Sequence, residues 1–172
     1  MSPARKPERG EIIDYYFTYV DQVGDGDLLE ILRGQHHEVL DLLGGVSEEG
    51  SRHRYAPGKW SIREVVAHVN DIERLFTFRA FWFARTPEEP LPSFDHELAA
   101  TASGADGRPL AEHLAEFGAV RAATYTLLDG LSPEAWERQG LASGNPFSVR
   151  GCAYIVAGHF AHHLRLLRKQ YL

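Results

Sequence analysis

Residues 148–172 read SVRGCAYIVAGHFAHHLRLLRKQYL, and this stretch decides the fold. Apolar residues recur in it every three or four positions, as they do along one face of a helix, and Ser148 is a suitable N-cap. Working back along the chain, the same spacing predicts helices over residues 27–43, 61–84 and 109–128. The sequence therefore predicts an all-α fold, a four-helix bundle.

The connection between the second and third expected helices is long. It holds a proline-rich stretch at residues 86–92, a short helical segment at 95–102 and the turn-forming sequence SGADG at 103–107. A link of this length can cross a bundle, so these two helices need not be antiparallel neighbours. Another short helix is expected at residues 132–136.

Length and composition bound the possible classes of protein. With 172 residues, 44% hydrophobic and 24% charged, the chain has the make-up of one globular domain. We expect this domain to span residues 25–172, with residues 1–24 as an N-terminal extension that packs on the bundle. The net charge of −6, without a Lys/Arg run, argues against a nucleic-acid partner.

No apolar run approaches the roughly 18 residues that a membrane-spanning helix needs. The N-terminal residues also lack the continuous apolar segment of a secretory signal. We therefore expect a cytoplasmic protein without a membrane partner. The single cysteine excludes a thiolate cage, so any metal site must use other ligands.

Two histidines of the last helix point inward. At about 100° per residue, His163 lies about 10° and His159 about 50° from the centre of the apolar stripe, whereas His162 lies about 110° away, at its polar border. His159 and His163 are four residues apart, one helical turn, so both rings can close on a single ion.

His68 lies on the flank of the apolar stripe of the second helix, about 60° from Val65. From there it can point toward a neighbouring helix. Burying three imidazoles without partners would cost about 1 to 3 kcal/mol each, and a shared metal removes this cost. A lone core histidine is nevertheless more often a structural residue than a ligand.

Missing motifs argue against three other kinds of site. A di-iron carboxylate bundle needs Glu-x-x-His on two helices, and no histidine here has a glutamate three residues before it. A zincin needs His-Glu-x-x-His, but Phe160 follows His159. The Gly-x-Ser-x-Gly elbow of Ser-His-Asp hydrolases does not occur.

The other candidates have simpler explanations. Cys152 is about 10 Å along the helix from His159, too far to share its ion, and is expected to be a small buried residue. Glu64 completes a capping box with Ser61, and an acid/base role for it is the alternative. His113 flanks the core, where a fourth-ligand role is the alternative. The remaining histidines are expected at the surface: His36, His37, His53 and His96.

The second helix carries more aromatic residues than one core stripe needs. They are Phe76, Phe78, Phe81, Trp82 and Phe83. Exposed apolar patches usually mark a binding surface. Part of this aromatic cluster is therefore expected to line a pocket or a dimer interface.

Four ordered motifs resemble the DinB-like superfamily. They are YAPGKWSIREVVAH at residues 55–68, LPSFD at 91–95, SGNPFSVR at 143–150 and AGHFAHHL at 157–164. The resemblance covers about residues 25–172 and implies a four-helix bundle, often dimeric, that holds one divalent metal. Carried over residue by residue, it implies the ligands His68, His159 and His163, the three that the helical wheel selects.

Two functions are consistent with this pattern. Three neutral imidazoles leave the ion its charge and an open position, as in a small metalloenzyme that transfers a thiol to an electrophile or hydrolyses its substrate. The substrate of such an enzyme would be a small thiol or an electrophile, and a second copy of the chain would be its protein partner. The metal would be Zn or Ni. The alternative is a non-catalytic, metal-stabilised helical module for protein interaction. Catalytic residues are not identified by the sequence.

Overall fold

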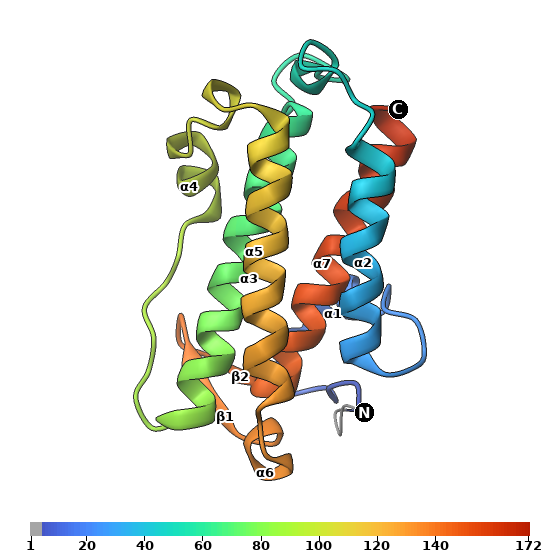
Figure 1. Ribbon diagram of the computed structural model, residues 1–172. Helices are drawn as coiled ribbons and strands as arrows, with labels where there is room; N and C mark the ends of the chain where they lie inside the picture. The colour runs from blue at the N-terminus through green and yellow to red at the C-terminus, as the bar shows by residue number, and fades with distance from the viewer. Residues whose placement is uncertain (1–4) are drawn as a thin grey trace.

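Four long helices lie side by side in the computed structural model, which describes residues 5–172 (Figure 1). They are α2 (Leu28–Leu43), α3 (Ile62–Arg85), α5 (Leu110–Asp129) and α7 (Val149–Gln170). Each lies within two residues of its predicted bounds. The predicted all-α four-helix bundle is confirmed, with one small sheet added to it.

The helices are connected in an unusual order. In Figure 1, α2 and α7 run in one direction while α3 and α5 run in the other. Helix α3 contacts both α5 and α7, and α2 contacts the same two helices. The consecutive helices α3 and α5 are therefore parallel neighbours, so the link between them has to return along the whole bundle. This long link carries α4 (His96–Ala102), as predicted, and the 3-10 helix η3 (Ala105–Gly107), which forms where the sequence predicts a turn.

Side-chain caps begin the helices where the sequence predicts. Asp27 accepts hydrogen bonds from the first turn of α2, and Ser148 accepts one from Gly151 in α7. Ser61 and Glu64 form both halves of a capping box on α3. Each cap satisfies backbone N–H groups that have no partner inside the helix. The helix starts are thus set by local sequence.

A β-hairpin before α7 was not predicted. Strands β1 (Gln139–Ala142) and β2 (Asn145–Ser148) pair antiparallel, following the short helix α6 (Pro133–Trp136). Four residues are too few to show a clear alternation, and the two-residue turn has Ser143 in the first position, where glycine or asparagine is the usual signal. Leu91 pairs with the hairpin through backbone hydrogen bonds, so the long link is fastened to it.

The N-terminal segment packs against α7. It contains the 3-10 helix η1 (Asp14–Tyr16) and α1 (Phe17–Val20), and another 3-10 helix, η2 (Gly50–Arg52), precedes α3. A Cβ on Gly158 would lie 2.2 Å from the Tyr19 carbonyl oxygen, so only glycine allows this approach of α1 to α7. Residues 1–4 of the expected extension lie outside the described residues.

Two apolar clusters form the core, and the boundary between them positions the site. Along α3, Val65 and Val69 belong to one cluster, whereas Ile72 and Phe76 belong to the other. Along α7, the boundary between the two clusters lies just before Phe160. Within residues 5–172, no helix is long and apolar enough to cross a membrane.

Candidate metal centre

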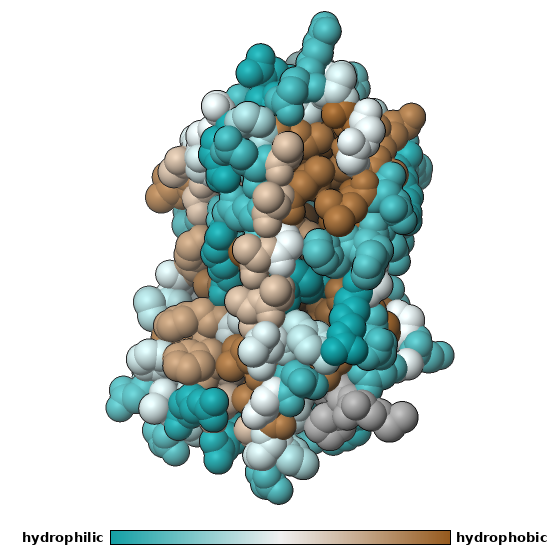
Figure 2. Space-filling view, in the orientation of Figure 1, coloured by the Kyte–Doolittle hydropathy of each residue, from teal (hydrophilic) through white to brown (hydrophobic). Residues whose placement is uncertain are grey.

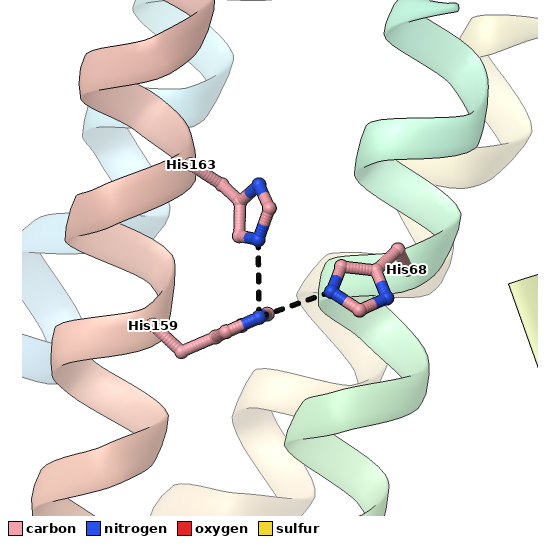
Figure 3. Close-up of side chains that lie close together, drawn as sticks. All are labelled: His68, His159 and His163. Carbon is pink, nitrogen blue, oxygen red and sulfur yellow. Dashed lines mark hydrogen bonds between the residues drawn. The ribbon is translucent and has the colours of Figure 1, made fainter. Parts of the chain in front are cut away.

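Three histidines meet at the boundary between the two apolar clusters. His68 comes from α3, while His159 and His163 come from successive turns of α7, and the three rings point into the space between these helices (Figure 3). All three side chains are buried. The structure thus brings together the residues that the helical wheel selects, and their role as metal ligands stays a prediction.

The nitrogen atoms of the three rings have the spacing of a metal site. The His159 Nε2 atom lies 3.1 Å from the Nε2 atom of His68 and 3.1 Å from that of His163. Tetrahedral zinc with Zn–N distances of about 2.0–2.1 Å requires nitrogen atoms about 3.3 Å apart. Among the described residues, these three histidines form the whole cluster of possible ligands.

Burial keeps the three imidazoles neutral. Burial, together with the neighbouring His96, lowers the pKa of His68 to about 4. Burial, together with His68 and His162, lowers the pKa of His163 to about 3. The pKa of His159 falls well below its usual range for the same two reasons. Neutral rings keep the lone pairs that a metal ion needs.

The surroundings of the rings also fit a metal better than a structural role. The buried Nδ1 atom of His163 has no hydrogen-bond partner among the described residues. Pairs of Nε2 atoms that face each other share one proton at most, so lone pairs remain unsatisfied. The Trp60 ring packs on His68 at 4.7 Å, and the Tyr19 ring packs on His159 at 5.3 Å. The donor set therefore fits a divalent ion.

A cavity of about 320 Å³ adjoins the three histidines. Its walls come from α3, α7, the N-terminal segment, the long link and the hairpin. Besides the histidine cluster, its polar or aromatic lining consists of Tyr15, Tyr16, Tyr19, Trp60, Phe76, Arg79, Phe94, His96, His162, Ser143 and Phe147. The histidines are thus accessible to a small molecule.

Most of this lining was missed by the sequence analysis. Arg79 had a detectable signal, because it follows His68 by eleven residues and is therefore only about 20° from it around α3. The tyrosines of the N-terminal segment and Ser143 of the hairpin had none, since their approach depends on tertiary packing.

The other histidines lie largely as expected. His37, His53 and His96 are exposed and His36 is half-buried, although the His96 ring lies 6.3 Å from His68 and lines the cavity. His162 is half-buried at the border of the stripe. The buried His113 ring has its Nε2 atom 2.9 Å from the Ala105 carbonyl oxygen, so it holds the long link and lies outside the histidine cluster.

Cys152 is a buried core residue and Glu64 belongs to a capping box, as expected from the sequence. Cys152 is fully buried, and burial raises the pKa of its thiol to about 12. Glu64 accepts the Ser61 backbone N–H in the capping box and pairs with Arg54. Both roles are structural.

The aromatic cluster of α3 divides between core and surface. Phe76 and Phe83 are buried, whereas Phe78 and Phe81 are 45% and 42% exposed. The exposed pair lines a groove of about 510 Å³ between α3 and α5. Figure 2 shows apolar surface over the lower half of α3. A dimer interface here stays a prediction.

Comparison with known proteins establishes the family. Residues 31–167 match the DinB superfamily, and the chain belongs to it. The solved structure of YfiT from Bacillus subtilis, described as a probable metal-dependent hydrolase with an unusual four-helix bundle topology, matches 98% of this chain and 95% of its own with a TM-score of 0.74. At 16% sequence identity, this likeness shows the shared fold alone. No curated protein matches the chain.

Proposed function

We propose that this protein is a small metal-dependent enzyme in which His68, His159 and His163 hold one divalent ion. The observation that carries the proposal is the convergence of three neutral Nε2 atoms at the wall of a cavity. Three protein ligands leave at least one position free for water or substrate, as catalytic sites require. The metal dependence attributed to YfiT supports the same function.

The reaction is a thiol transfer to an electrophile or a hydrolysis. A bound ion supplies a Lewis acid, which makes water or a thiol a better nucleophile at neutral pH. The chain holds that ion with uncharged ligands, so its positive charge is not cancelled. Tyr19 stays protonated, because burial raises its pKa, and its ring holds His159 in place. We expect zinc or nickel, since both suit imidazole ligands.

Metal analysis of protein purified without a histidine tag or added metal tests the site. We expect about one equivalent in the native chain and none in the triple variant His68→Ala, His159→Ala, His163→Ala. The matched control is the double variant His36→Ala, His37→Ala, which removes imidazoles from α2 outside the cluster and keeps the metal. Sub-stoichiometric metal in both the native chain and the triple variant would refute the proposal.

A second measurement separates an enzyme from a non-catalytic metal-stabilised module. In protein loaded with Co²⁺, the visible spectrum changes when a small thiol such as 2-mercaptoethanol binds to an open position on the ion. We expect this change, because the described residues supply three ligands and a cavity beside them. A spectrum that ignores the thiol, together with metal-dependent thermal stability, would favour the module.

The protein is also proposed to form a homodimer through the exposed aromatic residues of α3. Phe78 and Phe81 are large, exposed and adjacent to an apolar groove, which favours a partner surface. Sedimentation at low micromolar concentration should give two copies, and the Phe78→Ser, Phe81→Ser variant should give one. A monomeric native chain would contradict this assembly.

A further inference from the structure

Four arginines are buried in the described part of the chain, and one of them differs from the others. Arg63, Arg121 and Arg150 each pair with a carboxylate, from Glu48, Glu73 and Glu11 respectively. Arg79 is equally buried, with 4% of its surface exposed, but no carboxylate of residues 5–172 lies within ion-pair distance. Burying an unpaired charge is costly, so this arrangement calls for an explanation.

Aromatic rings surround the guanidinium of Arg79. Its central carbon lies 5.0 Å from the ring centre of Phe76 and 5.0 Å from that of Phe147. These contacts attract the cation but supply no counter-charge to it. The hydroxyl of Tyr16 is a hydrogen-bond partner of the guanidinium, but burial raises the pKa of Tyr16, so it remains a neutral phenol and supplies no counter-charge.

Arg79 lines the same cavity as the histidine cluster. It lies on the face of α3 that carries His68, about 16 Å further along the helix axis. Helical side chains lean toward the N terminus of their helix, so the guanidinium extends back toward His68. Ile72, Leu75 and Phe76 line the wall of α3 between them. The cavity thus has a cationic end, an apolar middle and an imidazole end.

We propose that Arg79 binds the anionic group of the substrate. The ligand is a small organic acid with an apolar body, and its carboxylate pairs with the guanidinium while its other end reaches the histidine cluster. A guanidinium offers two parallel N–H donors to such an oxyanion, and this pairing neutralises the buried charge. The position of the reacting end rests on the proposed function, whereas the anion site does not.

A carboxylate is favoured over a phosphate by the surroundings. The anion site contains aromatic walls and Arg79, which is the one arginine or lysine in the cavity lining of the described residues. One positive charge matches one carboxylate, whereas a phosphate monoester carries up to two negative charges.

Three matched probes test the anion site on metal-free protein by isothermal titration calorimetry. They are 4-phenylbutyrate, the neutral 4-phenylbutanamide and 3-phenylpropyl phosphate, which share one apolar body. We expect the acid to bind the native chain about tenfold or more tightly than the amide, as for a charge-assisted hydrogen bond. Arg79→Met should abolish this preference, and Arg79→Lys should retain part of it.

The control variant is Arg74→Met on the same helix. Arg74 is exposed and pairs with Glu116 outside the cavity, so its loss should leave the preference for the acid unchanged. Tighter Arg79-dependent binding of the phosphate probe than of the acid would assign the site to a phosphate and overturn the carboxylate. Equal binding of acid and amide by the native chain, or an unchanged preference in Arg79→Met, would overturn the anion site itself.

Thermal unfolding excludes a purely structural role. If Arg79 serves substrate, Arg79→Met should unfold at the same or a higher temperature, because an unpaired buried charge is replaced by an apolar side chain of similar length. A marked fall in the unfolding temperature, without any difference between acid and amide in the native chain, would make Arg79 a packing residue. Because the titrations use metal-free protein, they are unaffected if the proposed metal chemistry fails.

Discussion

Two buried polar clusters of α3 lie about two turns apart and differ in how completely they are paired. In the first, Arg121 donates two hydrogen bonds of 2.8 Å to Glu73 and others to Gln35 and the Leu32 carbonyl oxygen. Gln35 in turn donates to the Ala157 carbonyl oxygen on α7. In the second, Arg79 has no carboxylate partner within the described residues.

The difference indicates which cluster stabilises the fold and which serves a ligand. The first cluster joins α2, α3, α5 and α7, and its charges are neutralised within the protein. The second borders a cavity, where Arg79 has no carboxylate partner among the described residues and the buried Nδ1 atom of His163 has no hydrogen-bond partner. Proteins retain such unsatisfied groups where function requires them, at some cost in stability.

The largest effect on stability should come from breaking the paired cluster. Glu73→Gln leaves Arg121 buried without a counter-charge, which should lower the free energy of unfolding by about 3–5 kcal/mol. Urea unfolding of the metal-free protein measures this change. The double variant Glu73→Leu, Arg121→Met should recover much of the lost free energy of unfolding. If Glu73→Gln were within about 1 kcal/mol of the native chain, the paired cluster would not be what stabilises the fold.

His163→Ala should remove the stability that depends on metal. With zinc at a thousandfold excess over its Kd, binding adds about 4 kcal/mol to the native chain, and this increment should vanish in the variant. Thermal unfolding with zinc and with EDTA measures the increment. His162→Ala is the neighbouring control and should keep both the metal and the increment. The reverse pattern would show that the assigned helix phase is wrong.

Glu11→Gln tests a second ion pair, between Glu11 of the N-terminal segment and Arg150 of α7. Burial would raise the pKa of Glu11, but hydrogen bonds from Arg150 and other groups outweigh it and lower the pKa below 4.5. The ionised carboxylate therefore stabilises the fold fully above pH 4.5, and this contribution is lost as the pH falls through the lowered pKa.

At pH 7 the Glu11→Gln variant should be about 2 kcal/mol less stable than the native chain, because Arg150 retains its contact with Glu137. Urea unfolding measured from pH 7 down to pH 3 should show the two proteins converging at the acid end. A difference that stays constant over this range would mean that the charge of Glu11 is not responsible.

The smallest effect on stability should come from Ser143, which lines the cavity beside the histidines. Its φ of 54° lies in the left-handed region, which costs a residue with a Cβ about 1–2 kcal/mol. Ser143→Gly removes this cost but adds flexibility to the unfolded chain, so a net gain of about 0.5 kcal/mol is expected. Ser143→Val should instead destabilise the hairpin. Chemical denaturation of both variants measures whether the free energy of unfolding rises in Ser143→Gly and falls in Ser143→Val.

Local sequence was sufficient to predict the helices and the direction of the key side chains. The caps at Asp27, Ser61 and Ser148 bind backbone N–H groups within one turn, so they fix the helix starts independently of how the helices pack. The inward phase of His159 and His163 follows from the 3.6-residue period in the same way. That the two rings can reach one ion was therefore predictable from residues 148–172.

Only the tertiary structure decided what those side chains meet. His68 and His159 are 91 residues apart, and the contact of their rings depends on the antiparallel packing of α3 against α7. The hairpin and the tyrosines of the N-terminal segment complete the cavity through contacts that no local period encodes. The lack of a carboxylate partner for Arg79 emerges only when all four helices are assembled, because pairing depends on distance in space.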